Sequence, residues 1–395
     1  MALANFKIAF GARGAQYTKE DKDIVLSTME GRGGLTQGRW QERFEESFCS
    51  HFSLDSAFAT SSCTGALELA AILCQLKPED EVIAPAHTFA ATALPFARTG
   101  ATIRWADIDP DTWVMSADSV AELITKKTKV LVVVHLYGVP ADMDALLELA
   151  RANDIIVIED CAQALGATFK GKPAGGFGEA SCFSFHSHKI LTTLGEGGLL
   201  AVNRPAWKGL VAGLRHNGMR GFDGNRDRYW LPAMTNVDFD IEGQWPYKFC
   251  LGETQCALGF SLLQRLAKTI RRREELARRI RAAFSTTDFF TFQSLPDDRT
   301  SAFYALPIRV ADKHRDKVIT RMAEDFGVQC VTQYYPLYRY PIFVKAGFGE
   351  AMCPHTESFY DNMLSIPFYE GLTDEEVDQM IGGLTACANN EGSRS

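Results

Sequence analysis

Several features that would narrow the function of a protein are missing from this sequence. No apolar run approaches the length of a membrane span, and the opening residues MALANFKIAFGARG lack the apolar centre of a signal peptide. The net charge is −8, whereas a phosphate backbone needs a basic surface. We therefore expect neither membrane nor nucleic acid as a partner. The one basic stretch, at 270–283, has apolar residues at helical spacing, which indicates the solvated face of a long helix.

The ten cysteines include no C-x-x-C pair, and many stand in apolar stretches such as AAILCQL and EASCFSF. This usage is typical of reduced, buried thiols and predicts a cytoplasmic protein. The eight histidines show no ligand spacing beyond His186 and His188, which would share one face of a strand without a third ligand. We therefore expect no metal site.

What the sequence does contain is an ordinary globular composition, with 46% hydrophobic and 23% charged residues, over a length of 395 that allows two domains. From 56 to 203, short apolar runs alternate with helical stretches. Strands such as VLVVV and IIVI are apolar throughout, as expected where helices cover both faces of a sheet. The alternation predicts an α/β fold with a mostly parallel sheet.

A second region follows, and its boundary is expected near residue 260. The predicted domains are 1–260 and 261–395, the second beginning with a long linking helix near 258–284. A final helix is expected after an N-cap at Thr373, and the tail NNEGSRS is expected to be disordered.

Three junctions between a strand and the following segment carry polar or aromatic residues, and ligands of open α/β sheets bind at such junctions. In TSSCTGALEL the start of a helix would offer an anion site, or simply an N-cap by Ser62 or Thr64. In IIVIEDCAQ an apolar strand ends in Glu159-Asp160. A carboxylate at the end of a buried strand needs a cation or a hydrogen-bond donor as a partner, unless the aspartate is simply a helix N-cap. Phe89, past another strand, would cover a flat ligand or pack in the core.

A lysine stands in SFHSHKILTTLGEGG, between a strand and a glycine-rich turn. Lys189 is a surface charge, a phosphate ligand or a reactive amine, but the glycines follow it, so the sequence has no P-loop. The GGFG at 175–178 is too short for a dinucleotide-binding motif. An anion site, a carboxylate, an aromatic ring and an amine are together the groups that hold pyridoxal phosphate through its phosphate, pyridine nitrogen, ring and aldehyde.

The ordered motifs resemble those of the DegT/DnrJ/EryC1/StrS family, the sugar aminotransferases among fold-type I pyridoxal-phosphate enzymes. The resemblance covers about 34–384 and includes GGLTQGRWQERFE, SSCTGALEL, IEDCAQALGATFKGKPAGGFGEASCFSFHSHKILTTLGEGG, GETQCALG and SIPFYEGLTDEEVDQMI. It implies a large domain with a mostly parallel seven-stranded sheet between helices, and a smaller C-terminal α/β domain.

The resemblance also implies roles for individual residues. Lys189 would form a Schiff base with the cofactor and shuttle protons, Asp160 would pair with the pyridinium nitrogen, and Gln163 would hydrogen-bond the ring hydroxyl. The remaining cofactor contacts would be the phosphate-binding Cys63, Thr64 and Ser184 and the ring-stacking Phe89.

The implied reaction moves an amino group from glutamate or glutamine to a keto-sugar, most simply a nucleotide-linked one, in amino-sugar and polysaccharide biosynthesis. Related proteins act on cyclitols or free keto-sugars, and a pyridoxal-phosphate-binding regulator without turnover is a third reading. Retention of Lys189 favours transamination, because relatives that have histidine in its place are dehydratases. Family members are homodimers whose active sites lie at the interface.

Some positions depart from the family pattern. Cys63 replaces a glycine and Gly65 an alanine in the phosphate turn, and His188 replaces a threonine or serine before the lysine. An N-Y-R motif that binds the partner's phosphate reads Lys248-Phe249-Cys250, which makes Lys248 a candidate phosphate ligand of the other subunit. Substrate recognition is expected to differ in the segment that contains Arg220, Arg226, Arg228, Tyr229 and Trp230.

Overall fold

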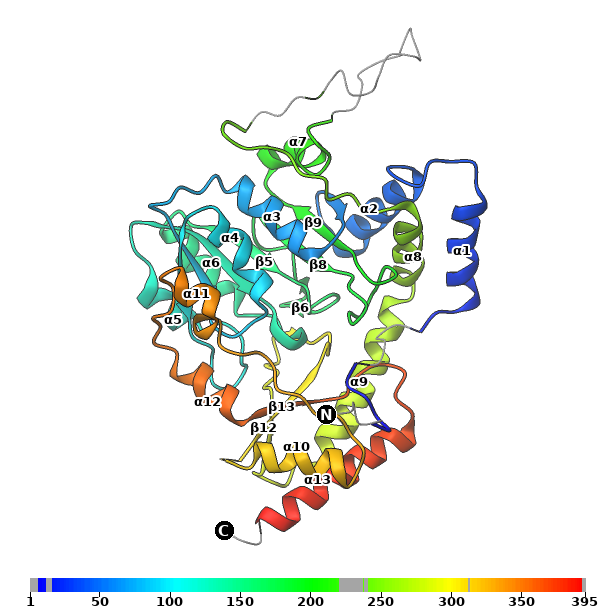
Figure 1. The fold of residues 1–395 in the computed structure, drawn as a ribbon, viewed down its shortest axis with the longest axis vertical. Coiled ribbons are helices and arrows are strands. Elements are labelled where there is room, and N and C mark those ends of the chain that lie inside the picture. The colour runs from blue at the N-terminus through cyan, green and yellow to red at the C-terminus, as the bar shows by residue number, and fades with distance from the viewer. Residues whose placement is uncertain (1–5, 12–15, 220–236, 238–240, 312, 393–395) are drawn as a thin grey trace.

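A mostly parallel seven-stranded sheet forms the centre of the computed structural model, which describes residues 6–11, 16–219, 237, 241–311 and 313–392 (Figure 1). The strand order is β1-β9-β8-β5-β4-β2-β3, and only β9 runs against its neighbours, β1 and β8. The predicted α/β fold is thereby confirmed. The strands are β1 (Ala57–Thr60), β2 (Glu81–Pro85), β3 (Thr102–Ala106), β4 (Thr128–Val134), β5 (Ile156–Asp160), β8 (Ala180–Ser184) and β9 (Gly198–Val202).

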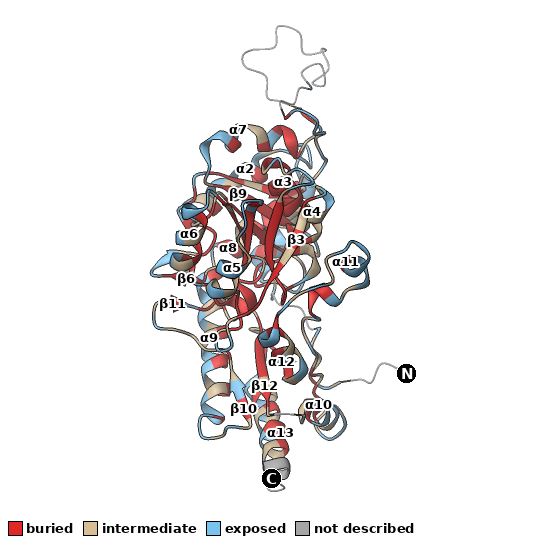
Figure 2. Ribbon diagram, turned by 90° about the vertical axis from the view of Figure 1, so that its left-hand side faces the viewer, coloured by how far each residue is buried: buried red, intermediate tan, exposed pale blue. Residues whose placement is uncertain are grey.

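Helices cover both faces of this sheet, which explains why its strands are apolar throughout (Figure 2). In β4, Val130 and Val132 belong to the core cluster that includes α3, whereas Leu131 and Val133 belong to the cluster that includes α6. The helices of this part are α1 (Lys19–Glu30), α2 (Arg39–Phe52), α3 (Cys63–Leu73), α4 (Leu94–Arg98), α5 (Ala117–Leu123), α6 (Met143–Ala152), α7 (Pro205–Leu214) and α8 (Glu253–Leu263).

The C-terminal part has its own small sheet and core. Its antiparallel sheet has the order β10-β12-β13, and a fourth cluster of buried residues joins this sheet to α9, α10 and α13. The elements are α9 (Leu266–Ala283), β10 (Phe290–Phe292), β12 (Leu306–Val310), α10 (Arg315–Glu324), α11 (Pro341–Lys345), α12 (Pro354–Asn362), β13 (Met363–Ile366) and α13 (Asp374–Gly392), with the short strands β6 (Thr168–Phe169), β7 (Lys172–Pro173) and β11 (Arg299–Thr300) in a third sheet. A domain boundary near residue 260 stays a prediction.

Among the described helices, none combines the length and the apolarity that crossing a bilayer requires.

The expected linking helix differs from the observed one. It is divided into α8 and α9, with Gln264 and Arg265 between them. Most of the basic stretch is solvated, but Arg273 is buried because it lies one turn from Leu276 and Ala277 on the apolar face of α9.

The end of the chain also differs from expectation. Thr373 caps α13 as predicted, since its Oγ1 accepts a hydrogen bond from the backbone N–H of Glu376 at 3.2 Å. The helix then continues to Gly392, through the first residues of the tail that was expected to be disordered. Residues 393–395 lie outside the described part.

One contact joins segments far apart in the sequence. The N-cap of α2 is Gly38, which has no side chain to cap the helix. Instead, the carboxylate of Glu253 at the start of α8 accepts hydrogen bonds from the backbone N–H groups of Gly38, Trp40 and Gln41 at 3.0, 2.9 and 3.0 Å. Two motifs recognised separately in the sequence, GGLTQGRW and GETQ, therefore form one unit.

Candidate active site

The ends of the parallel strands surround a cavity of about 520 Å³, within the ~300–1,000 Å³ typical of small-molecule sites. Segments that follow β1, β2, β5 and β8 supply much of its wall, as the topology of an open α/β sheet predicts. It is lined by all seven residues that the sequence placed in the site of one chain: Cys63, Thr64, Phe89, Asp160, Gln163, Ser184 and Lys189.

Lys189 lies just beyond β8, and its backbone N–H bonds the carbonyl of His186 at 2.9 Å. Its Nζ stands 4.3 Å from the centre of the Tyr304 ring. Within the described residues, this amine has no hydrogen bond or ion pair. An amine that faces a cavity without a polar partner is available for chemistry.

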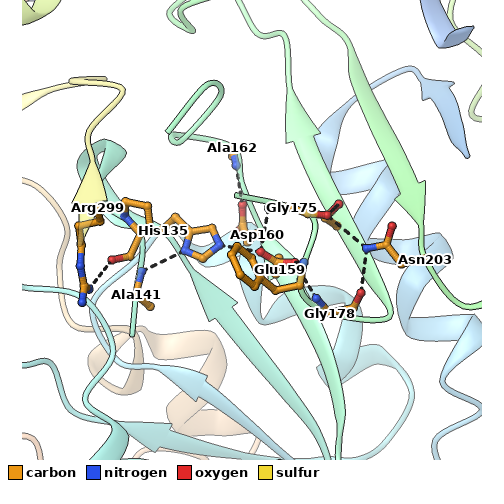
Figure 3. Close-up of polar contacts among 12 residues, drawn as sticks. His135, Ala141, Glu159, Asp160, Ala162, Gly175, Gly178, Asn203 and Arg299 are labelled. Carbon is orange, nitrogen blue, oxygen red and sulfur yellow. Dashed lines mark hydrogen bonds and ion pairs between the residues drawn. The ribbon is translucent and has the colours of Figure 1, made fainter. Parts of the chain in front are cut away.

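Asp160 ends β5 and is buried. Its Oδ2 accepts a hydrogen bond from the Thr92 hydroxyl at 2.7 Å, and its Oδ1 accepts one from the backbone N–H of Ala162 at 3.1 Å (Figure 3). The residue caps a turn, not a helix, which corrects the N-cap alternative. Both donors are neutral, and no cation among the described residues pairs with Asp160. A buried carboxylate in this state favours a positively charged ligand group.

Gln163 connects the cavity to a buried network. Its Oε1 accepts a hydrogen bond from the backbone N–H of Tyr137 at 2.8 Å, and its Nε2 donates one to the Tyr334 hydroxyl at 3.0 Å. Because an amide nitrogen carries two hydrogens, one N–H of Gln163 is left for a ligand. The hydroxyl of Tyr137 in turn bonds His87 and the carbonyl of Gln333, both at 2.9 Å.

The N-terminus of α3 provides the anion site. Ser62 is the N-cap, and its Oγ accepts a hydrogen bond from the backbone N–H of Gly65 at 3.0 Å, so the cap is not Thr64. The first N–H groups of the helix, at Cys63 and Thr64, are left for a ligand. Burial, with the negative charge of Asp160, raises the pKa of the Cys63 thiol far above its usual value, so the thiol stays neutral. The turn is closely packed, since a Cβ at Gly198 would clash with the backbone nitrogen of Cys63.

Phe89 and Ser184 complete the predicted set. Phe89 is 58% exposed although it lines the cavity, and its ring centre lies 6.3 Å from that of Tyr334. An exposed phenyl ring at a cavity is suited to cover a flat ligand, and it contradicts the core-packing alternative. Ser184 is buried at the end of β8.

Glu159, beside Asp160 in sequence, is engaged on the other face of the sheet. It accepts hydrogen bonds from His135 at 2.9 Å and from the backbone N–H groups of Gly175, Phe177 and Gly178 at 2.8, 2.7 and 2.7 Å (Figure 3). Burial alone would raise the pKa of Glu159, but the bond from His135 and those from the backbone outweigh it and lower the pKa. The GGFG segment therefore binds a carboxylate of its own chain.

Glu159 also belongs to a buried trio with His135 and Cys161 whose potential ligand atoms lie within 4.8 Å of one another. The Nδ1 of His135 accepts the backbone N–H of Ala141 at 3.1 Å, and its Nε2 bonds Glu159. Burial, with the charges of Glu159 and Asp160, raises the pKa of the Cys161 thiol. Both ring nitrogens of His135 and the carboxylate of Glu159 are thus bonded within the protein, and the thiol is held in its neutral form, so the trio does not support a metal site.

Other predicted residues lie elsewhere. His186 and His188 follow the end of β8 instead of sharing a strand face, and their rings stack with centres 5.2 Å apart. Lys248 is exposed and does not line the cavity of its own chain. Arg220, Arg226, Arg228, Tyr229 and Trp230 lie outside the described residues.

The sequence did not single out Tyr304, Tyr334 or Thr92, all of which contact groups of the site. The two tyrosines come from the C-terminal part, where no strand end of the main sheet marks them. The hydroxyl of Thr92, three residues after Phe89 in PAHTFAATAL, was the available signal for a partner of the carboxylate.

The described residues fit pyridoxal phosphate. The uncapped N–H groups of α3 suit a phosphate, and the buried Asp160 without a cation suits a protonated ring nitrogen. The Phe89 ring suits a flat heterocycle, and the unpartnered Lys189 amine suits an aldehyde. Four separate features of one cavity thus agree with one ligand.

Comparisons with known proteins point to the same chemistry. The DegT/DnrJ/EryC1/StrS aminotransferase family matches residues 16–385. The spore coat polysaccharide biosynthesis protein SpsC of Bacillus subtilis is 33% identical over 369 residues, covering 92% of this chain and 93% of the relative. GDP-perosamine synthase of Caulobacter vibrioides is 30% identical over 368 residues, covering 92% of this chain and 94% of the relative.

A solved structure agrees in fold and in cofactor. The PLP form of a putative sugar aminotransferase, Spr1654 of Streptococcus pneumoniae, superposes with a TM-score of 0.84 at 25% identity, covering 96% of this chain and 98% of that one. The cofactor is pyridoxal phosphate (PLP), as expected. The chain belongs to the DegT/DnrJ/EryC1/StrS aminotransferase family and is a PLP-dependent sugar aminotransferase.

Proposed function

We propose that this enzyme transfers the amino group of glutamate or glutamine to a nucleotide-linked keto-sugar. The observation that carries the proposal is the pairing, in one cavity, of an amine without a polar partner, Lys189, and a buried carboxylate without a cation, Asp160. The name of the relative GDP-perosamine synthase supports a nucleotide-linked substrate.

Lys189 is proposed as the catalytic residue. When bound, PLP supplies an aldehyde that bonds amines and a ring that accepts the charge left by a broken C–H bond. Lys189 would hold the aldehyde, and its Nζ, once freed by the donor amine, would be placed to remove the proton from the donor α-carbon. The same Nζ handles the proton in the reverse direction when the keto-sugar receives the amine.

The other residues bind and orient. Asp160 would keep the ring nitrogen protonated, and Thr92 and the N–H of Ala162 hold its carboxylate in place. Gln163 donates its second N–H to the ring hydroxyl. Cys63, Thr64 and Ser184, which line the cavity, would bind the phosphate, and Phe89 would cover the ring.

The assembly is proposed to be a homodimer with active sites at the interface. The exposed position of Lys248, outside the cavity of its own chain, suits the predicted contact with phosphate in the other subunit. A cytoplasmic location is supported by the ten cysteines, all of which are free thiols.

Spectra and product analysis test the function. The purified protein with PLP should be yellow, and glutamate or glutamine should bleach it as the amino group is transferred. A nucleotide-linked keto-sugar should then restore the colour and yield an amino sugar. If only an inosose or a free keto-sugar restored the colour, the substrate would belong to one of those classes instead. Binding of PLP without bleaching by any amino acid would favour a regulator and overturn the proposal.

A further inference from the structure

The cavity that contains Lys189 adjoins a second, smaller one. Phe10, His188, Tyr304 and Gln333 line both, and Arg273 lines only the smaller. The smaller cavity has a volume of about 40 Å³. A water molecule needs roughly 10–15 Å³ of such space, so the cavity has room for roughly three heavy atoms, the number in a carboxylate group.

Arg273 makes this cavity suitable for an anion. Its side chain is buried, with Nη2 donating to Glu370 at 2.8 Å and Nη1 donating to the carbonyls of Phe303 and Tyr304 at 3.2 and 3.3 Å. A third nitrogen of the group, Nε, is buried and has no hydrogen-bond partner among the described residues. A buried N–H of a cation without an acceptor is costly unless a ligand or water supplies one.

Two further groups of the smaller cavity complement Arg273. The terminal amide of Gln333 has a buried oxygen without a partner, and turning the amide by a half-turn would present its N–H groups instead. His188 supplies a ring N–H at the boundary with the main cavity. Glu370 occupies only the Nη2 of Arg273, and burial raises the pKa of the Glu370 carboxyl group although Arg273 opposes this.

The smaller cavity lies beside the reacting amine. The ring of Tyr304 is 4.3 Å from the Nζ of Lys189, and the carbonyl of the same tyrosine accepts the hydrogen bond from Arg273. Tyr304 therefore stands between the guanidinium of Arg273 and the place beside the Nζ of Lys189 where the amine of the amino-acid donor would lie. A donor that carries a carboxylate several bonds from its amine can bridge this separation.

We propose that the smaller cavity binds the side-chain carboxylate of the amino-acid donor, through Arg273, His188 and Gln333. The inference rests on the proposed transamination and narrows its donor to glutamate. Glutamine is disfavoured because its amide carries no negative charge for the guanidinium, and alanine does not reach the cavity.

The test compares donors in the first half-reaction, followed as bleaching of the yellow holoenzyme by glutamate, glutamine or alanine. Arg273→Lys and His188→Asn should each raise the glutamate concentration for half-maximal rate by about tenfold or more, and leave alanine unchanged. Arg272→Lys is the matched control, since Arg272 neighbours Arg273 on α9 but is paired at the surface with Glu275 and Asp374. The control should retain the preference for glutamate.

A binding measurement separates this inference from the proposed function. Glutarate, which has two carboxylates and no amine, should bind the holoenzyme by calorimetry more tightly than butyrate, and this difference should shrink in both variants. Equal losses for glutamate and alanine in both variants, with the glutarate preference intact, would overturn the subsite and leave a structural role for Arg273. If no amino acid bleaches the protein, transamination fails, and glutarate binding alone decides the subsite.

Discussion

The two sides of the sheet at the end of β5 treat neighbouring carboxylates in opposite ways. Successive residues of a strand point to opposite faces, so Glu159 and Asp160 share a strand but not an environment. Glu159 accepts four hydrogen bonds, from a histidine and three backbone N–H groups. Asp160 accepts two, from neutral donors, and faces the cavity. The saturated group holds the fold together, whereas the group left without a charge partner serves a ligand.

Lys189→Ala tests the cavity side most severely. Removing the amine should lower amine transfer by at least roughly 10³-fold, because the same nitrogen bonds the cofactor and moves the proton. The measurement is the rate of amino-sugar formation, with the melting temperature as a check on folding. Lys127→Ala, at an exposed lysine, is the control and should transfer at the normal rate. Comparable turnover by the two variants would remove Lys189 from the mechanism.

Asp160→Asn should lower the rate by roughly 10²–10³-fold, since a neutral amide no longer holds a proton on the ring nitrogen. Stability should stay constant or rise, because the substitution removes a buried charge that lacks a cation. Denaturant unfolding and the turnover rate are measured on the same sample. If Asp160→Asn lost much of its stability but kept full activity, Asp160 would have a structural role like that of Glu159, and the contrast between the two carboxylates would fail.

Glu159→Gln should show the opposite pattern, with a loss of about 2–4 kcal/mol in the free energy of unfolding and little change in the rate per folded molecule. The control is Glu148→Gln, at an exposed position of α6.

The same variant predicts a pH dependence. Because the pKa of Glu159 is lowered in the folded protein, its stabilisation is complete above the ordinary value of 4.5 and is lost as the pH falls through the lowered pKa. The stability difference between wild type and Glu159→Gln should therefore shrink on acidification below that value. A difference that is constant from neutral to acidic pH would mean that Glu159 is not ionised.

Phe89→Ala should have the smallest effect. Losing the ring should weaken PLP binding by about 1 kcal/mol, or about fivefold, and leave stability unchanged because the side chain is largely exposed. Phe96→Ala, in the buried core next to the same segment, should instead cost about 3–5 kcal/mol of stability. Titration of the apoenzyme with PLP and thermal unfolding distinguish the two results, and tighter or equal PLP binding by Phe89→Ala would contradict stacking.

The sequence is sufficient to place those site residues that directly follow a predicted strand or begin a predicted helix. Asp160 and Lys189 each follow a strand, and the ends of parallel strands meet at one edge, so their convergence follows from the α/β pattern. The N-cap of α3 was narrowed to two residues, but hydrogen-bond geometry was needed to choose Ser62.

The remainder depended on contacts between distant segments. Tyr304 and Tyr334 enter the cavity because the C-terminal part packs against the strand ends, which no local pattern predicts. Arg273 was assigned to the solvated face from its charge, although its spacing from Leu276 and Ala277 places it on the apolar face of α9. In each case the pairing partner, such as Glu370, lies far away in the sequence.

The cap that Glu253 gives to α2 has a consequence for the growing chain on the ribosome. The helix begins at Arg39, yet its cap is 212–215 residues downstream. At the usual synthesis rate of about 5–20 residues per second, α2 emerges roughly 10–40 s before the carboxylate that completes it. The N-terminus of α2 therefore lacks its cap during about half of translation. In fragments that end before α8, this helix should stay uncapped and should bind chaperones.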